Sequence, residues 1–205
     1  MNQLSPALLE LVARAMNDDE SRRELIKHVE ILKTSDSEPA DDQTHRINGA
    51  TVDLGRAARC GFGEVIFGEG KSAELVTRII QTQLDQGQSA FITRIDSGVA
   101  FQVRQSFTHT QHNPVARTLR VSATKLGNTQ PLASDQLERT FHAAVVTAGS
   151  TDLAVAEEAI ETLIWMGIAF QRFDDIGVAG PQRLAAAIPN LNAASAVVVV
   201  AGMEG

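Results

Sequence analysis

The sequence contains a single cysteine among its 205 residues. Cys60 has no partner within the chain, so no internal disulfide can form, and we expect a reducing compartment such as the cytoplasm. Long apolar runs are also lacking, because none approaches the 18 or more residues of a transmembrane helix. The first residues lack the basic and then apolar order of a signal peptide. We therefore predict a soluble, cytoplasmic protein without a membrane partner.

Basic residues are fewer than acidic ones, 18 against 25, and the net charge is −7. This balance argues against nucleic acid as a partner. The rest of the composition, 43% hydrophobic and 21% charged residues, is that of a globular protein. The shortage of basic residues is concentrated in residues 141–205, which contain two basic and seven acidic residues. Two compositional regimes indicate two structural units.

The first part of the chain divides into two predicted segments. Residues 1–45 contain two amphipathic helices and then a polar, acidic, proline-containing linker. Residues 46–130 alternate short apolar runs with turn residues, which is typical of a small α+β domain of β-α-β-β type. Within this domain we predict a helix and four strands, at 73–86 and at 64–67, 90–95, 100–104 and 118–123.

The last segment, residues 138–205, has continuous apolar strands that alternate with helices. We predict strands at 143–147, 170–173 and 196–201 and helices at 153–166 and 179–187. This alternation is typical of a parallel sheet covered on both faces. The predicted fold class is therefore α/β: N-terminal helices and a small α+β unit, followed by an incomplete three-layer αβα, Rossmann-like parallel sheet.

Turns at the carboxyl ends of these strands are candidate ligand sites, because they present backbone amides and helix N-termini. The first turn, residues 149–152, reads Gly149-Ser150-Thr151-Asp152 and offers two hydroxyl groups before a helix. It suits a phosphate group. The alternative is a capped turn in which Ser150 or Asp152 only satisfies backbone amides.

Two more turns carry charged side chains. The turn after the second strand contains Asp174 and Asp175, and Arg183 lies at the start of the next helix, where it can bind phosphate or carboxylate. Glu204 follows the third strand, and a buried carboxylate there needs a ligand, a metal or a general-base role. The alternative for all four is solvated surface charge.

Residues 53–71 concentrate charged side chains around glycines, including the candidate substrate contacts Arg56, Arg59 and Lys71. This segment either binds an anionic nucleotide or packs one domain against the other. The histidines do not form a metal-ligand set, since His109 and His112 lie in a polar stretch without a third ligand and are expected in a surface loop. No metal-binding residues are therefore predicted.

Six segments of the chain carry a resemblance to a known family, namely residues 61–71, 93–94, 116–119, 145–159, 175–180 and 200–205. Six motifs in order along one chain are a specific signal, although each is weak alone. Taken in this order, they resemble the LarB family. This family is the carboxylase/hydrolase of nickel-pincer nucleotide cofactor biosynthesis, and its C-terminal domain is similar to PurE, the aminoimidazole ribonucleotide carboxylase.

The resemblance implies a substrate, nicotinic acid adenine dinucleotide, and two reactions. The pyridinium ring is carboxylated by CO2 or bicarbonate, and the phosphoanhydride is hydrolysed with the help of Mg²⁺. It also implies a homo-oligomer. Residues that match the family's motifs are expected to bind phosphate or ribose, namely Gly149, Ser150, Thr151, Asp152 and Arg183, with Asp175 and Glu204 as catalytic carboxylates.

Two departures from the family pattern bear on activity. The pyridinium must first accept a nucleophile before its ring can attack CO2. In the family this nucleophile is a cysteine in a C-terminal segment that the chain lacks, and Cys60 does not correspond to it. We therefore expect the chain to be truncated and inactive alone, with apolar surface exposed on its last strand. The family's His-Arg pair reads Gln182-Arg183 here.

Two other functions remain open from the residues alone. One is a PurE-type carboxylase that acts on aminoimidazole ribonucleotide. The other is a non-catalytic fragment that binds a nucleotide or another subunit.

Overall fold

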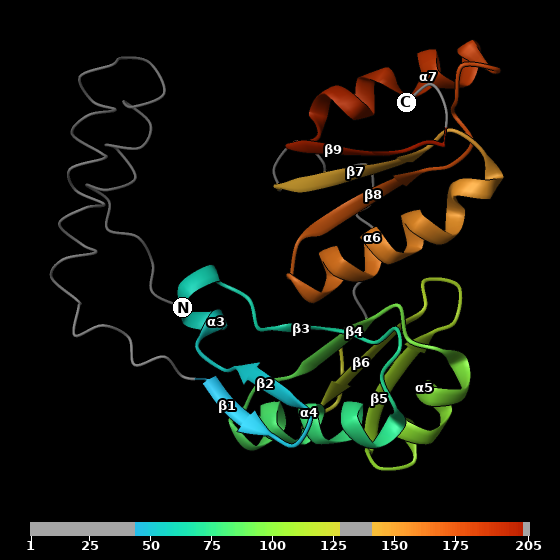
Figure 1. The fold of residues 1–205 in the computed structure, drawn as a ribbon. Helices are drawn as coiled ribbons and strands as arrows, with labels where there is room; N and C mark the ends of the chain where they lie inside the picture. Colours follow the sequence, from blue (N-terminus) through green and yellow to red (C-terminus); the bar gives the residue numbers. More distant parts are fainter. Residues whose placement is uncertain (1–43, 128–140, 203–205) are drawn as a thin grey trace, which may run out of the picture. The chain divides into compact units, whose positions relative to one another are not determined.

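The computed structural model describes residues 44–127 and 141–202 (Figure 1). The predicted helices and linker before residue 44, the predicted boundary between residues 130 and 138, and Glu204 lie outside the described residues. Residues 44–205 belong to one compact unit. Its described part contains a two-stranded hairpin, a four-stranded mixed sheet and a three-stranded parallel sheet.

The hairpin and one short helix precede the mixed sheet. Strands β1 (Thr44–Ile47) and β2 (Ala50–Asp53) pair antiparallel through a turn in which Gly49 has a φ of 94°. Helix α3 (Arg56–Cys60) follows and ends at Gly61, whose φ of 81° is the left-handed conformation that glycine adopts without strain. These elements lead the chain into the first strand of the mixed sheet.

The mixed sheet has the strand order β3-β4-β6-β5, in which β3 and β4 are parallel and the other neighbours are antiparallel. Helices α4 (Ala73–Asp85) and α5 (Ser97–Arg104) cover one of its faces (Figure 1). The core between them is aliphatic and includes Ile80, Ile92 and Leu119, all fully buried. The strands are β3 (Val65–Phe67), β4 (Ala90–Thr93), β5 (His109–Asn113) and β6 (Thr118–Ser122).

The prediction of a strand at 100–104 is wrong, because these residues belong to α5. The helix begins at Asp96, whose carboxylate accepts hydrogen bonds from the amides of Gly98 and Val99. This N-cap satisfies amides that a helix start leaves free, and Ala100 and Val103 then face the core one turn apart. The domain is therefore of β-α-β-α-β-β type.

The predicted surface loop around His109 and His112 is also wrong, because this polar stretch is strand β5. It pairs with β6 along its whole length, from His109 opposite Ser122 to Asn113 opposite Thr118. All five of its residues are partly buried. These residues adopt a strand conformation because they pair with β6, although they have little β propensity of their own.

The parallel sheet has the order β8-β7-β9 and confirms the predicted α/β class. Helices α6 (Leu153–Trp165) and α7 (Pro181–Ala193) lie on its opposite faces (Figure 1). Ala156 and Ile160 of α6 pack on Val145, while Leu184 and Ala187 of α7 pack on Val146. The strands are β7 (His142–Thr147), β8 (Ala169–Phe173) and β9 (Ala196–Val200).

The second helix of this unit is longer than predicted, whereas the last strand has the exposed apolar surface that the sequence led us to expect. Helix α7 continues past Pro189 to Ala193, because Leu191 packs into the core below its last turn. Strand β7 is buried at every position, whereas Val197 and Val199 of β9 are 48% and 54% exposed.

None of the described helices is long and apolar enough to span a membrane.

Candidate functional site

The site lies where the chain connections of the parallel sheet diverge. Helix α6 leads from β7 to β8 on one face of the sheet, and α7 leads from β8 past β7 to β9 on the other (Figure 1). The carboxyl ends of β7 and β9 are therefore adjacent, at the point where the connections change from one face of the sheet to the other. Such a switch point is the usual ligand crevice of an open α/β sheet.

The turn after β7 carries four of the predicted site residues. A short 3₁₀ turn, η2 (Ser150–Asp152), precedes α6, and the Asp152 carboxylate accepts the Gly149 amide at 3.0 Å. Asp152 thus caps its own turn, as the capping interpretation predicted. Ser150 and Thr151 are exposed. Their hydroxyl groups are available to a ligand at this end of the sheet.

The end of β9 lies against the same turn. The Ala148 amide donates to the Val200 carbonyl at 3.1 Å. A Cβ added to Gly202 would lie 3.9 Å from Asp152 Oδ1, which places the residues after β9 beside the Asp152 carboxylate. The predicted catalytic Glu204 comes two residues later, outside the described residues.

The turn after β8 is bound to the end of β7. The Asp175 amide donates to the buried Thr147 hydroxyl at 2.9 Å, and the next two amides donate to the Thr147 and Ala148 carbonyls at 3.0 and 3.1 Å. Asp175 has a φ of 56°, a left-handed conformation that aspartate tolerates better than most residues. Any Cβ at Gly177 would lie 2.5 Å from the Ala148 carbonyl oxygen, so only glycine permits this approach.

The carboxylate of Asp175 forms an ion pair with Arg183 at the start of α7. Both side chains are about half exposed. Gly180 leaves room for this pair, since a Cβ there would lie 2.4 Å from Arg183 Nε. The structure therefore brings together the predicted residues Asp175 and Arg183, and it holds their charges at the surface of the turn.

Asp174 has a different role from its neighbour. Both of its carboxylate oxygens accept hydrogen bonds from Arg172 Nε, at 2.8 and 2.6 Å, and Arg172 also pairs with Glu157 of α6. The hydrogen bond to Asp174, followed by that to Glu157, raises the pKa of the Arg172 guanidinium above its usual value. Asp174 is thus engaged by the protein itself.

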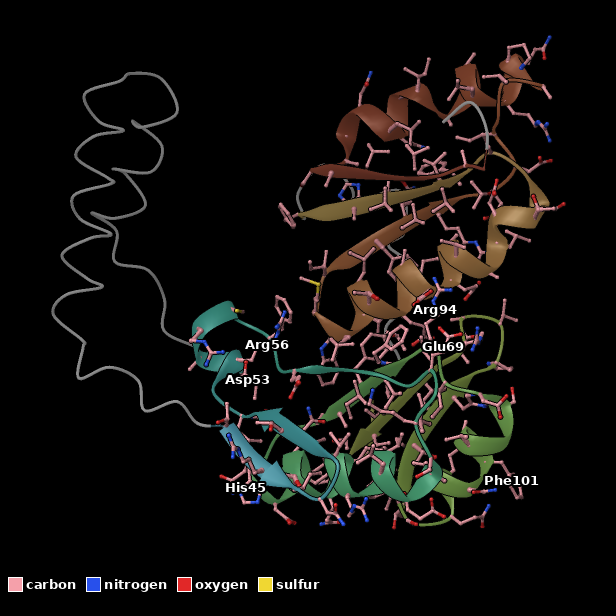
Figure 2. The ribbon with its side chains drawn as sticks, in the orientation of Figure 1. His45, Asp53, Arg56, Glu69, Arg94 and Phe101 are labelled. Carbon is pink, nitrogen blue, oxygen red and sulfur yellow. The ribbon has the colours of Figure 1, made fainter. Side chains whose placement is uncertain are left out.

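The charged residues predicted at 53–71 do not form one site. Arg59 pairs with Asp53 at 2.5 Å, and the Arg56 guanidinium lies over the Phe62 ring at 5.2 Å. Lys71 lies beyond the other end of β3, with its Nζ 5.9 Å from the centre of the Phe67 ring. In Figure 2, Asp53 and Arg56 lie together, away from Glu69 and Arg94. The two arginines have local partners within the domain.

The contacts that the acidic residues of α6 make with the mixed sheet were not predicted from the sequence. Glu158 pairs with Arg94 at 2.8 Å, and Glu161 pairs with Arg120 at 3.1 Å. Both Glu157 and Glu161 accept hydrogen bonds from the Asn113 side chain. Arg120 could have indicated such a contact, because an arginine in the middle of an apolar strand needs a buried anionic partner.

The described side chains offer few groups that could together hold a metal ion. Within residues 44–127 and 141–202, no three His, Cys, Asp or Glu side chains gather into a metal site. Mg²⁺, however, is commonly bound by one or two carboxylates together with substrate phosphates and water. The half-exposed carboxylate of Asp175 fits a site that is shared with a bound phosphate.

Comparison with known proteins bears on the domain that precedes the parallel sheet. Residues 44–124 match the LarB/PurE-like N-terminal domain. An uncharacterized protein of Methanocaldococcus jannaschii is 27% identical over 158 residues, which are 75% of this chain and 59% of that protein. The chain thus spans less than two thirds of the length of this relative. Residues 44–124 are thus similar to the N-terminal domain of the LarB/PurE-like family.

Proposed function

We propose that the chain binds nicotinic acid adenine dinucleotide as part of a LarB-like enzyme that carboxylates its pyridinium ring and hydrolyses its phosphoanhydride. The observation that carries this proposal is the attachment of the turn after β8 to the end of β7 through Thr147 and Ala148. It holds Asp175 and Arg183 at the sheet edge that also carries Ser150 and Thr151. The family relationship supports a carboxylase-type reaction.

These groups suit the phosphate groups of a pyridine dinucleotide. Arg183 can exchange its ion pair with Asp175 for a phosphate group, because guanidinium binds phosphate through two parallel hydrogen bonds. The Ser150 and Thr151 hydroxyls and the nearby helix start favour the same anion. Asp175, released from Arg183, would hold Mg²⁺ jointly with that phosphate. The cation would neutralise charge on the phosphoanhydride during hydrolysis.

The carboxylation step places a further demand on the site. A pyridinium ring becomes nucleophilic only after a thiolate adds to it, and the resulting enamine-like carbon then attacks CO2. A base must next remove the proton from that carbon, and departure of the thiolate restores the ring. We propose Glu204 as this base from its place after β9. Cys60, exposed at the end of α3, is not assigned the role of the thiolate.

Calorimetric titration with nicotinic acid adenine dinucleotide and Mg²⁺ tests the proposal. We expect binding to the wild-type chain and weaker binding to Arg183→Gln, whereas Arg78→Gln on exposed α4 surface serves as the matched control. Absence of binding, or equal affinities of all three proteins, would refute the proposed site. Tighter binding of aminoimidazole ribonucleotide would favour the PurE-type function instead.

Incubation with bicarbonate then separates an enzyme from a binding fragment. AMP release and a CO2 mass increase in the pyridine nucleotide would show catalysis by the chain. Binding without either product would favour the non-catalytic alternative for this chain. The homo-oligomer implied by the resemblance is tested by gel filtration with multi-angle scattering, and a monodisperse monomer would contradict it.

A further inference from the structure

Helix α6 is packed on two faces. Ala156 and Ile160 contact the parallel sheet, whereas Glu157 and Glu161 contact residues of the mixed sheet. One turn further, Trp165 stacks on Phe91 of β4, with ring centres 5.6 Å apart. These three contacts with the mixed sheet come from buried or partly buried side chains, so α6 connects the LarB/PurE-like N-terminal domain to the site.

Asn113 connects that domain to α6 at its edge strand β5. Its side-chain Nδ2 donates to Glu157 Oε2 at 3.1 Å and to Glu161 Oε1 at 3.2 Å. Its Oδ1 accepts the amides of Val115 and Ala116, each at 3.1 Å, and so closes the turn before β6. The Oδ1 atom therefore holds a turn within the domain, and the Nδ2 atom binds the domain to α6.

Arg172 continues the same set of contacts to the site. Its guanidinium contacts Glu157 of α6 and both carboxylate oxygens of Asp174. Asp174 precedes Asp175, whose amide and carboxylate hold the turn against Thr147 and Arg183. Asn113, Glu157, Arg172 and Asp174 thus form a continuous chain of hydrogen bonds from β5 to the turn after β8.

We propose that Asn113 and Arg172 are positioning residues for the turn that carries Asp175 and Arg183. Through them, the LarB/PurE-like N-terminal domain sets the geometry of the site at the end of the parallel sheet. The inference depends on the proposed function only for the identity of this turn as a substrate site. The hydrogen-bonded chain itself is a property of the described residues.

The variant Asn113→Asp separates the two roles of the side chain. It retains an oxygen that accepts the Val115 and Ala116 amides, and it replaces the donating NH2 group by a carboxylate oxygen beside Glu157 and Glu161. Repulsion between these like charges should displace Glu157 and weaken its hold on Arg172. Amide hydrogen exchange, measured on peptides that cover residues 174–180, reports on the turn directly.

We expect exchange in this turn to accelerate by about three- to thirtyfold, which lies within the effects seen for coupled side chains in one network. Asn48→Asp makes the same chemical change in the exposed β1–β2 turn and should leave residues 174–180 unchanged. Equal exchange in the two variants would overturn the proposal. Acceleration spread evenly over α4 and β4 would also overturn it, because that pattern marks a general loss of stability.

Two further variants keep the test decisive. Asn113→Asp combined with Glu157→Gln exchanges the amide and the carboxylate between the two positions and has the wild-type net charge. The new carboxylate at position 113 still lies beside Glu161, so we expect exchange to return only part of the way to the wild-type rate. Arg172→Lys keeps the positive charge but loses the two-point contact with Asp174, so it should accelerate exchange in the same peptides. Failure of both expectations would refute the positioning role even if Asn113→Asp did not fold.

A binding measurement links the inference to the substrate. Asn113→Asp should raise the Kd for nicotinic acid adenine dinucleotide, and the amide–carboxylate exchange variant should lower it again. If the wild-type chain does not bind this dinucleotide while the exchange results hold, the proposed function fails and the positioning role stands. If the dinucleotide binds wild type and Asn113→Asp equally, the positioning role fails and the proposed function stands.

Discussion

Two arginine–carboxylate pairs in this protein have the same chemistry and opposite surroundings. Arg120 and Glu161 join the mixed sheet to α6, and their side chains are only 6% and 9% exposed. Arg183 and Asp175 lie on the turn after β8, and their side chains are 48% and 53% exposed. Burial therefore distinguishes a pair that holds two parts of the molecule together from a pair that can change partners.

The physical reason is the cost of separating the charges. A buried pair cannot be broken without leaving an uncompensated charge away from water, so it persists in every state of the folded protein. An exposed pair contributes little to stability, because water and salt replace each partner at small cost. Arg183 is thus free to bind a phosphate group, whereas Arg120 is not.

The largest effect is expected from Arg120→Met at the buried pair. This change leaves Glu161 buried without its arginine and should lower the free energy of unfolding by about 3–5 kcal/mol. Urea unfolding measures the loss. The double variant Arg120→Met with Glu161→Leu should be more stable than the single variant, because it removes both charges. A single variant as stable as wild type would show that the pair does not hold α6.

Gly177→Ala tests the backbone contact below the exposed pair. Its Cβ would lie 2.5 Å from the Ala148 carbonyl oxygen, so the turn must move, and we expect a loss of about 1–3 kcal/mol in unfolding free energy. Thermal unfolding is the measurement. Gly202→Ala is the matched control, because its Cβ would meet Asp152 only at 3.9 Å. Similar losses in the two variants would contradict the close approach at Gly177.

Arg183→Gln sharpens the comparison at the exposed pair. We expect the free energy of unfolding to stay within about 0.5 kcal/mol of wild type. The affinity for nicotinic acid adenine dinucleotide should fall by about tenfold, as expected for a lost hydrogen bond to a charged group. Calorimetric titration beside a denaturation curve separates the two effects. A large loss of stability would place Arg183 in the same class as Arg120.

The smallest effect is expected from pH, through His112 beside Asn113. Burial, and then the charge of Arg104, lower the pKa of this imidazole below 6.5. The unfolded chain therefore binds the His112 proton more tightly, and stability should fall as pH drops below about 6.5 towards the lowered pKa. His112→Gln should reduce this loss in unfolding curves taken at several pH values. Unchanged pH dependence, relative to His45→Gln on exposed β1, would contradict it.

Most strands and helices could be predicted from the pattern of apolar residues. Strands β7 and β9 could be predicted because each is a continuous apolar run. Helix α4 could be predicted from its N-cap and its helical spacing of apolar residues. Helix α5 was not predicted, because the apolar residues near Ala100 fit a short strand as well as a helix. Asp96, which caps the start of this helix, is the residue that favours the helix. Strand β5 was missed because its polar residues become a strand only beside β6.

The candidate site was predicted in part. The turn sequences indicated Asp175 and Arg183, and the structure brings these two together. Asn113 and Arg172 were not found, because nothing in their local sequence distinguishes them from surface residues. Their contacts with α6 join segments 15 to 48 residues apart, and sequence periodicity carries no information about such pairs.

By itself, the sequence determined the α/β class, the succession of the main strands along the chain and the position of the turns that carry charge. These depend on local periodicity and on the residues that begin and end helices, which act within a few positions of the chain. Only the tertiary structure decided which charges are buried. Arg120 and Arg183 differ in role because one faces α6 across a sheet and the other faces water, and that difference arises from packing between distant segments.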